Sequence, residues 1–247
     1  MSGTVLYDFS GGMESAAMLV IDAERIRNLD AIVRWVDTGK QFPEMYQSIA
    51  QIESILGYEI VRVPKRITFD QYLWEHGGSL KRGWNDCSRK MKRSNLSRHM
   101  RTFPRPYEVN LGYNSEEGKR ADNFIDRNER DYLHWRFPLI EAGINREATV
   151  ELCERAGFSV LVEMYRKMGR FDCYFCPNQS DAQAKKVIEH YPVLAAEWIA
   201  LEDRKGHSFR SVPLHVLAAA SSCSPESPLK CGCFGGDDEF DDLGDEE

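Results

Sequence analysis

The sequence predicts an α/β fold in which a twisted, mostly parallel sheet carries helices on both faces and is followed by a helical, cysteine-bearing C-terminal region. Two observations predict this. In the first third of the chain, strand-like apolar runs alternate with segments whose apolar residues recur at helical spacing. From residue 146 to the low 200s the pattern is almost entirely helical, with one interruption at residues 173–177.

Individual elements follow from the same patterns. Strands are expected at residues 4–9, 31–36, 58–63 and 107–111, and helices at residues 15–27, 44–56, 87–101 and from 117 onward. Residues 218–231 are rich in Ala, Ser and Pro and are expected to be loose. We therefore predict an α/β domain at 1–140, a helical region with a CxxC and a CxC at 141–234, and a tail at 235–247.

Composition indicates a soluble globular chain. The 247 residues are 42% hydrophobic and 29% charged, and no stretch approaches the roughly 20 apolar residues that span a membrane. The N-terminus lacks a basic, signal-type segment. We expect a cytoplasmic protein without a membrane partner, in which the 7 cysteines are thiols or metal ligands rather than disulfides.

The acidity of the chain is concentrated in its tail. Residues 235–247 contain 8 of the 39 acidic residues and no Lys or Arg, so the net charge of −7 becomes about +1 for the remainder, with 32 basic and 31 acidic residues. Such a composition predicts disorder. The tail either aids solubility or mimics an anion and shields a basic site.

A glycine pair follows the first predicted strand, in the segment Ser10-Gly11-Gly12-Met13-Glu14-Ser15. Glycines allow a tight turn and a close approach of the backbone to an anion. The helix that follows presents unpaired amide groups and the positive end of its dipole, and the two serines add hydroxyl groups. The segment predicts a phosphate site, although a plain strand-to-helix turn has the same pattern.

This segment resembles the PP-loop (SGGxDS) of the ATP pyrophosphatases, also called adenine-nucleotide α-hydrolases, which are Rossmann-like. They include the phosphoadenosine phosphosulfate (PAPS) reductases, the ATP sulfurylase small subunit and enzymes that thiolate tRNA or DNA. The resemblance implies that Ser10, Gly11, Gly12, Met13 and Ser15 bind the nucleotide. Glu14 stands where the family usually has Asp, and the resemblance implies a catalytic role for it near Mg²⁺ or pyrophosphate.

Two further segments extend the resemblance. Residues 37–44 (DTGKQFPE) follow the second strand and resemble the DTGxxFPE segment of PAPS reductases, which implies that Asp37, Thr38, Gly39 and Phe42 border the adenosine. Residues 112–121 (GYNSEEGKRA) resemble the GxRxxEsxxRa signature. There the resemblance implies nucleotide binding by Gly112 and an oxyanion contact from Arg120, and Asn114 replaces the first arginine.

Residues 81–105 form a basic segment with nine Lys or Arg residues and Asp86 as its one acid. This density can neutralise phosphates of a nucleotide or a nucleic acid, and Trp84 could stack on a base. A solvated basic helix is the plainer interpretation. Arg89 and Lys90 match an RK pair of the family, which implies catalytic contacts to the anionic end of the substrate. The segment is also the expected docking site for a nucleic acid or a sulfur donor.

Five cysteines are candidate metal ligands. Cys173 and Cys176 form a CxxC, and a full site needs about four ligands. One arrangement adds Cys87, as in adenylyl sulfate reductases with a [4Fe–4S] cluster, although Asp86 occupies the first cysteine position there. The other adds Cys231 and Cys233 and makes a zinc or iron–sulfur site, and a hybrid of the two also satisfies the pattern. Cys153 has the pattern of a buried core residue.

Three functions compete. The first is ATP binding with cleavage of the α–β phosphate to adenylate a substrate, with Mg²⁺, in sulfur-related or nucleic-acid-modification chemistry; the unmodified loop favours it. The second is a sulfonucleotide (PAPS or adenylyl sulfate) reductase, in which Cys231 is the candidate nucleophile. The third is a non-catalytic nucleotide or nucleic-acid binding module. A homodimer is compatible with all three.

Overall fold

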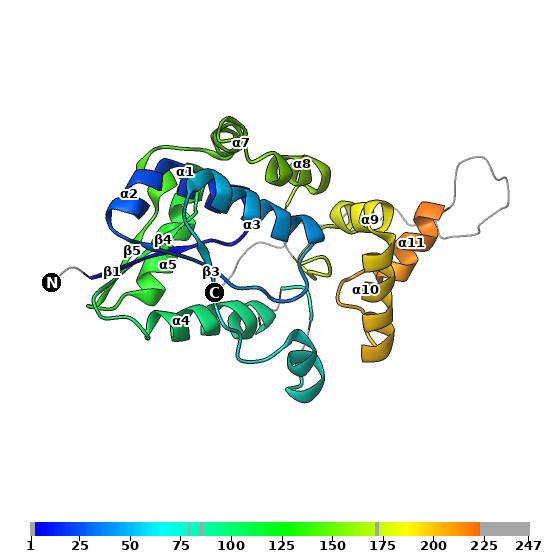
Figure 1. The fold of residues 1–247 in the computed structure, drawn as a ribbon. Helices are drawn as coiled ribbons and strands as arrows, with labels where there is room; N and C mark the ends of the chain where they lie inside the picture. The colour runs from blue at the N-terminus through cyan, green and yellow to red at the C-terminus, as the bar shows by residue number, and fades with distance from the viewer. Residues whose placement is uncertain (1–2, 79, 84–85, 171–172, 223–247) are drawn as a thin grey trace.

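The core of the molecule is a five-stranded parallel sheet in the order β3-β2-β1-β4-β5. The structure is a computed structural model that describes residues 3–78, 80–83, 86–170 and 173–222. The strands are β1 (Thr4–Asp8), β2 (Ile32–Trp35), β3 (Ile60–Arg62), β4 (Tyr107–Leu111) and β5 (Leu133–Arg136). Helices lie on both faces of this sheet (Figure 1), so the predicted fold class is confirmed.

The first four strands lie where the sequence predicts them, and β5 was not predicted. The register pairs Tyr7 of β1 with Val33 of β2 and with Asn110 of β4. Alternation along β1 places Leu6 and Tyr7 in two different hydrophobic cores, one on each face. The sheet is therefore buried on both sides, as parallel sheets usually are.

Fourteen helical segments occur within the described ranges, and their bounds follow. They are α1 (Met13–Ile21), α2 (Ala23–Asn28), α3 (Pro43–Leu56), the π-helices η1 (Gln71–Glu75) and η2 (Ser88–Arg93), α4 (Ser94–Met100), the 3₁₀ helix η3 (Ser115–Glu117), α5 (Gly118–Asn128), α6 (Pro138–Glu141), α7 (Arg146–Arg155), α8 (Ser159–Met168), α9 (Asp181–His190), α10 (Pro192–Lys205) and α11 (Leu214–Ser222).

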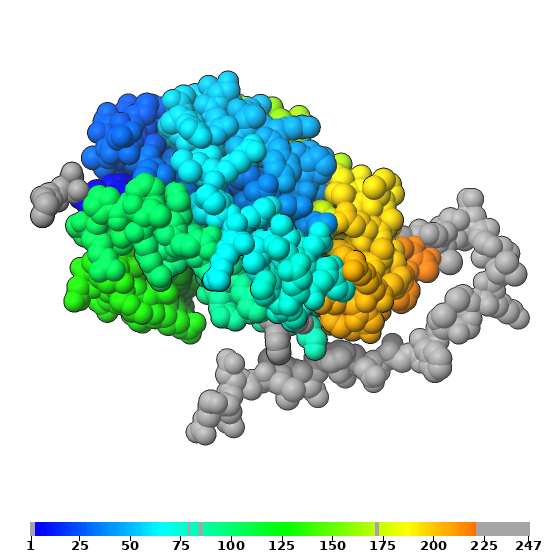
Figure 2. All heavy atoms as spheres, turned by 60° about the horizontal axis from the view of Figure 1, so that its bottom comes forward, coloured from blue at the N-terminus to red at the C-terminus, as the bar shows by residue number. Residues whose placement is uncertain are grey.

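Helices α1 and α3 lie on one side of the sheet with α7 and α8 outside them, and α4 lies on the other side (Figure 1). Figure 2 turns the α4 side toward the reader, where the segments from η1 to α4, coloured cyan to green, lie in front. The larger core is continuous from Tyr7 in β1 to Trp198 in α10 and Leu217 in α11. The predicted boundary at residue 140 remains a prediction.

Three element predictions need correction. The helix expected at 15–27 is two helices, because the backbone breaks at Asp22, whose side chain is buried and accepts a hydrogen bond from Tyr7 at 2.7 Å. The basic helix at 87–101 begins as a π-helix and continues as α4. The loose segment expected from Ala218 is helical up to Ser222, where α11 ends.

No helix within the described ranges combines the length and the apolar sequence that crossing a membrane requires. The acidic tail, together with Trp84, Cys231 and Cys233, lies outside the described residues. What the sequence predicts for these residues therefore stays a prediction.

Candidate functional site

The predicted phosphate loop, residues 10–15, turns sharply from the end of β1 into α1. Gly11 has a φ of +87°, which side chains other than glycine rarely adopt. The Ser10 and Ser15 hydroxyl oxygens lie 2.9 Å apart, and the Ser15 hydroxyl donates to the Gly12 carbonyl at 2.9 Å. Gly12 caps α1 and has no side chain that could occupy the first-turn amides, so these amides are available to an anion.

Two close contacts shape the loop, one with a side chain and one with the backbone. A Cβ on Gly11 would collide with the Met45 thioether of α3. A Cβ on Gly112, just after β4, would lie 2.6 Å from the Ser15 Cα and 2.8 Å from its nitrogen. The loop after β4 therefore lies directly against the start of α1, and only glycine allows that distance.

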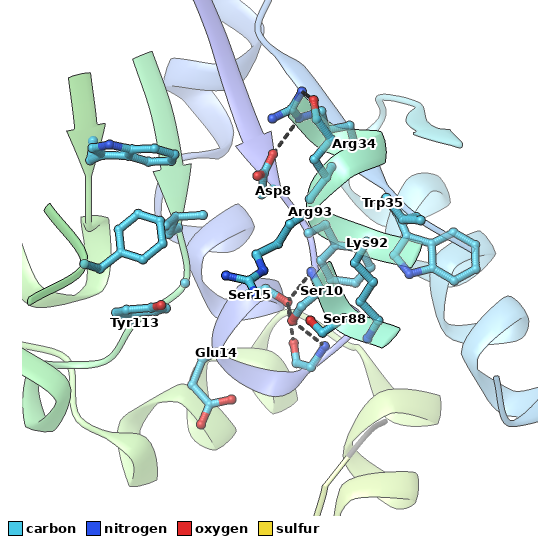
Figure 3. A pocket seen from close by; sticks show the side chains of 18 of the residues that line it. Asp8, Ser10, Glu14, Ser15, Arg34, Trp35, Ser88, Lys92, Arg93 and Tyr113 are labelled. Atoms are coloured by element: carbon cyan, nitrogen blue, oxygen red, sulfur yellow. Dashed lines mark hydrogen bonds and ion pairs between the residues drawn. The ribbon is translucent and has the colours of Figure 1, made fainter. Parts of the chain in front are cut away.

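A cavity of about 890 Å³ opens beside the loop, where β1, β2 and β4 end, and continues along the sheet (Figure 3). Such a volume suits a nucleotide-sized ligand. Seven of the residues proposed from the sequence line it, namely Ser10, Gly12, Met13, Glu14, Ser15, Gly112 and Arg120.

The loop at residues 37–44 contacts the cysteine turn rather than the cavity. Asp37, Thr38, Gly39 and Phe42, all described, do not line the cavity. The Asp37 carboxylate accepts from the Gly39 amide at 2.7 Å and from the Tyr46 hydroxyl at 3.1 Å, which is a local turn. The buried Thr38 hydroxyl lies 3.2 Å from the Cys173 sulfur. This loop therefore packs on the cysteine turn.

Arg89 and Lys90, which match the family's RK pair, also lie off the cavity wall. Their side chains pair with Asp86 at 2.5 Å and 3.2 Å, and Tyr72 donates to the same carboxylate at 3.0 Å. Burial raises the pKa of Asp86, but these three partners lower it more, so the pKa lies below its ordinary value.

Lys92 and Arg93 line the cavity instead. They lie two and three positions after Lys90 in the same π-helix. In Figure 3 the Arg93 side chain reaches toward Ser15, with Lys92 and Ser88 beside Ser10. A π-helix closes its hydrogen bonds over five residues rather than four, so it changes which side chains share a face. Charge density alone could not distinguish these cations from their neighbours.

Arg120 lies on the cavity wall, where its oxyanion contact stays a prediction, and Asn114 has a structural role. The Arg120 guanidinium pairs with Glu117 and lies 4.3 Å from the Tyr113 ring centroid. The buried Asn114 side chain caps η3 by accepting from the Glu116 amide at 2.9 Å. The residue that replaces the family's first arginine is thus a helix cap.

Two ion pairs at the cavity were not predicted. Glu14 lies 3.5 Å from Arg146, the first residue of α7, and its carboxylate points away from the two serine hydroxyls (Figure 3). Asp8 and Arg34 pair at 2.6 Å at the ends of β1 and β2, and Arg34 is only 2% exposed. Because side chains alternate between the two faces of a strand, the sequence pattern of β1 and β2 could have indicated that Asp8 and Arg34 lie on the same face of the sheet.

The described cysteines form no metal site by themselves. Across residues 3–78, 80–83, 86–170 and 173–222, no three Cys, His, Asp or Glu side chains are grouped so that they could hold one ion. Cys87 with the CxxC pair is therefore not a complete site. Burial raises the pKa of the Cys87 thiol, and the neighbouring Cys173 raises it further.

The turn that carries Cys173 is held from its C-terminal side. The Gln179 side-chain amide donates to the Cys173 backbone carbonyl at 3.0 Å, and the buried Arg210 side chain donates to the Gln179 backbone carbonyl at 2.6 Å. Cys153 is fully buried, as predicted, and burial raises the pKa of its thiol to about 12.

Known proteins resemble this chain. Two uncharacterized proteins of Methanocaldococcus jannaschii are 25% and 23% identical to it over 81% and 78% of its length, and the chain spans 47% and 40% of theirs, less than half. A solved U34-tRNA thiolase from Methanococcus maripaludis, with its [4Fe–4S] cluster, is 13% identical with a TM-score of 0.43, over 78% of this chain and 72% of that one.

The phosphoadenosine phosphosulfate reductase domain family matches residues 4–136, which include the phosphate loop, the basic segment and all five strands. This range is more than half of the chain. The protein therefore belongs to the phosphoadenosine phosphosulfate reductase domain family.

Proposed function

We propose that the cavity binds ATP with Mg²⁺ and that the protein cleaves the α–β phosphate bond to adenylate a substrate. The observation that carries this proposal is the intact loop at residues 10–15, which lines the same cavity as Lys92 and Arg93. Amides, hydroxyls and cations thus line one cavity, and this combination suits a pyrophosphate group. An enzyme that receives an already cleaved nucleotide has no need of a pyrophosphate site.

In the proposed reaction, an acceptor oxygen bonds to the α-phosphorus, the bond from that phosphorus to the bridging oxygen breaks, and pyrophosphate leaves. The loop amides and the Ser10 and Ser15 hydroxyls hold the leaving group, and Arg93 offsets its growing charge. Mg²⁺, when bound, neutralises phosphate oxygens. Of the three cavity carboxylates, Glu14 would hold it, because its ion pair with Arg146 is the longest of the three. The Glu14 side chain, which points away from the serine hydroxyls, would turn toward the phosphates to do so.

A competition experiment with the full chain tests the proposal. We expect ATP to displace a fluorescent ATP analogue at least about tenfold more effectively than AMP, because only ATP and ADP carry a β-phosphate for the loop. A sulfonucleotide reductase would prefer adenosine 3′,5′-bisphosphate and would release sulfite from adenylyl sulfate or its 3′-phosphate. Equal affinity for ATP and AMP, or no binding, would contradict the proposal.

Glu14→Gln is expected to remove most of the Mg²⁺ enhancement of ATP binding, because the amide has lost the charge that attracts the ion. Glu14→Asp restores the residue usual in the family and should keep the enhancement. Glu151→Gln on α7, 64% exposed and outside the cavity, is the matched control. Titration calorimetry with and without Mg²⁺ measures the effect. An unchanged Mg²⁺ dependence in Glu14→Gln would remove Glu14 from the metal site.

We further propose that the CxxC pair holds a zinc ion or an iron–sulfur cluster together with Cys231 and Cys233. The sequence pattern supports this, and Cys231 and Cys233 lie outside the described residues. We expect anaerobically purified protein to contain stoichiometric metal that Cys173→Ser loses and that Cys153→Ala, in the core, keeps. Metal analysis with an absorption spectrum distinguishes iron from zinc, and metal-free wild-type protein would refute the proposal.

A further inference from the structure

The cavity carries more positive charge than one nucleotide needs. Nine Lys or Arg side chains and three carboxylates line it, which gives its wall a formal net charge of +6. All three carboxylates, Asp8, Glu14 and Glu117, are already paired with arginines of the same wall. ATP with Mg²⁺ would neutralise only part of this charge, so the remainder favours a second polyanionic ligand.

The cavity also continues well beyond the phosphate loop. Tyr107, at the first position of β4, and Leu111, at the last, both line it. At about 3.3 Å per residue, the cavity follows the sheet for roughly 13 Å from the phosphate loop toward the opposite edge. There is therefore room for a further group next to a nucleotide at the loop.

We call this far part the amino-edge lobe, and define it by Arg101, Arg105, Tyr107 and Tyr132. Neither Arg101 nor Arg105 has a carboxylate partner among the described residues: Arg101 donates to the Ser97 hydroxyl at 3.4 Å, and Arg105 stacks on Tyr132 at 3.8 Å from the ring centroid. Both side chains are exposed. Their guanidinium groups can therefore bind phosphate oxygens without giving up an ion pair.

Aromatic rings form the wall that connects the lobe to the phosphate loop. Phe124 and Trp135 meet edge to face at 4.8 Å, and Tyr113 lies 6.2 Å from Phe124. The Trp135 indole donates to the Asn128 carbonyl at 3.1 Å, which fixes the orientation of its ring. Half-buried rings beside guanidinium groups are the combination with which proteins stack bases and hold the phosphates between them.

We infer that the amino-edge lobe binds single-stranded nucleic acid, which is the acceptor in the proposed adenylation. This inference rests on the proposed function. Phosphates of the strand contact Arg101 and Arg105, and a base stacks on the wall that includes Trp135. A volume of about 890 Å³ excludes a duplex, so the strand enters as an end, a loop or a base turned out of a helix.

The test is fluorescence anisotropy of the full chain with labelled single-stranded RNA, single-stranded DNA and duplex DNA, over a series of salt concentrations. We expect salt-dependent binding of a single strand, and the tighter of the two single strands identifies the acceptor. The double substitution Arg101→Ala and Arg105→Ala should weaken it at least about tenfold and reduce the slope of log affinity against log salt by about 1.4, which is roughly 0.7 for each single-strand phosphate contact. Lysine at both positions should retain most of the slope.

Arg155→Ala on α7, 71% exposed and outside the cavity, is the control and should bind the strand as the wild type does. Unfolding curves and ATP affinity are measured on the same variants, and strand affinity should fall more than ATP affinity. Three results would overturn the inference: no salt-dependent strand binding, unchanged binding in the double variant, or equal binding of duplex. Wild-type protein that binds ATP but no strand refutes the inference alone, and wild-type protein that binds no ATP refutes the proposed function.

Discussion

Gly112→Ala is expected to lower the affinity for ATP about a hundredfold, because the new Cβ would force the phosphate loop out of place. That Cβ would lie 2.6 Å from the Ser15 Cα and 2.8 Å from the Ser15 nitrogen, and backbone atoms cannot rotate away as a side-chain tip can. The start of α1 must therefore move away from β4. A shift of about 1 Å in a positioned group can weaken its effect about a hundredfold.

The same substitution should lower the free energy of unfolding by about 1–3 kcal/mol, as overpacking usually does. Titration calorimetry with ATP and denaturant unfolding measure the two effects separately. Gly118→Ala is the matched control: Gly118 is helical, with a φ of −53°, and a Cβ added to it would meet no atom within 4 Å. The Gly118→Ala variant should bind ATP normally, and its free energy of unfolding should rise by up to about 1 kcal/mol. Normal ATP binding by Gly112→Ala would show that the close approach does not shape the site.

Arg93→Ala should weaken ATP binding by about 10- to 100-fold, the usual effect of losing one charge-assisted hydrogen bond to a phosphate. Arg93 lines the cavity and reaches toward Ser15 (Figure 3). Arg89→Ala should change the affinity by no more than about threefold, because the Arg89 side chain is 63% exposed and pairs with Asp86 away from the cavity.

The comparison of Arg93 with Arg89 separates two assignments of the basic segment. Both residues belong to η2 and have the same charge, so Arg89→Ala controls for the loss of one positive charge from this segment. Calorimetry of both variants at one salt concentration measures the difference. If Arg89→Ala is the more damaging, the assignment from the family's RK pair is right and the structure-based assignment is wrong.

Local patterns predicted the elements with strong periodicity. Strands β1 to β4 and helix α3 lie where apolar alternation or helical spacing indicates them. The short edge strand β5 was missed because its Leu-His-Trp-Arg sequence becomes a strand only through pairing with β4. The break at Asp22 was missed for a similar reason, since it is stabilised by Tyr7 and Arg136, which are distant in the sequence.

The sequence by itself determined the family, the parallel sheet and the place of the glycine loop between β1 and α1, because a strand, two glycines and a helix form a turn that depends mainly on local sequence. Only the tertiary structure decided which cations face that loop. The π-helix turns Lys92 and Arg93 toward the cavity, while Arg89 and Lys90 remain with Asp86. It also decided that Thr38 packs against Cys173, because contacts between distant segments depend on how the helices pack on the sheet.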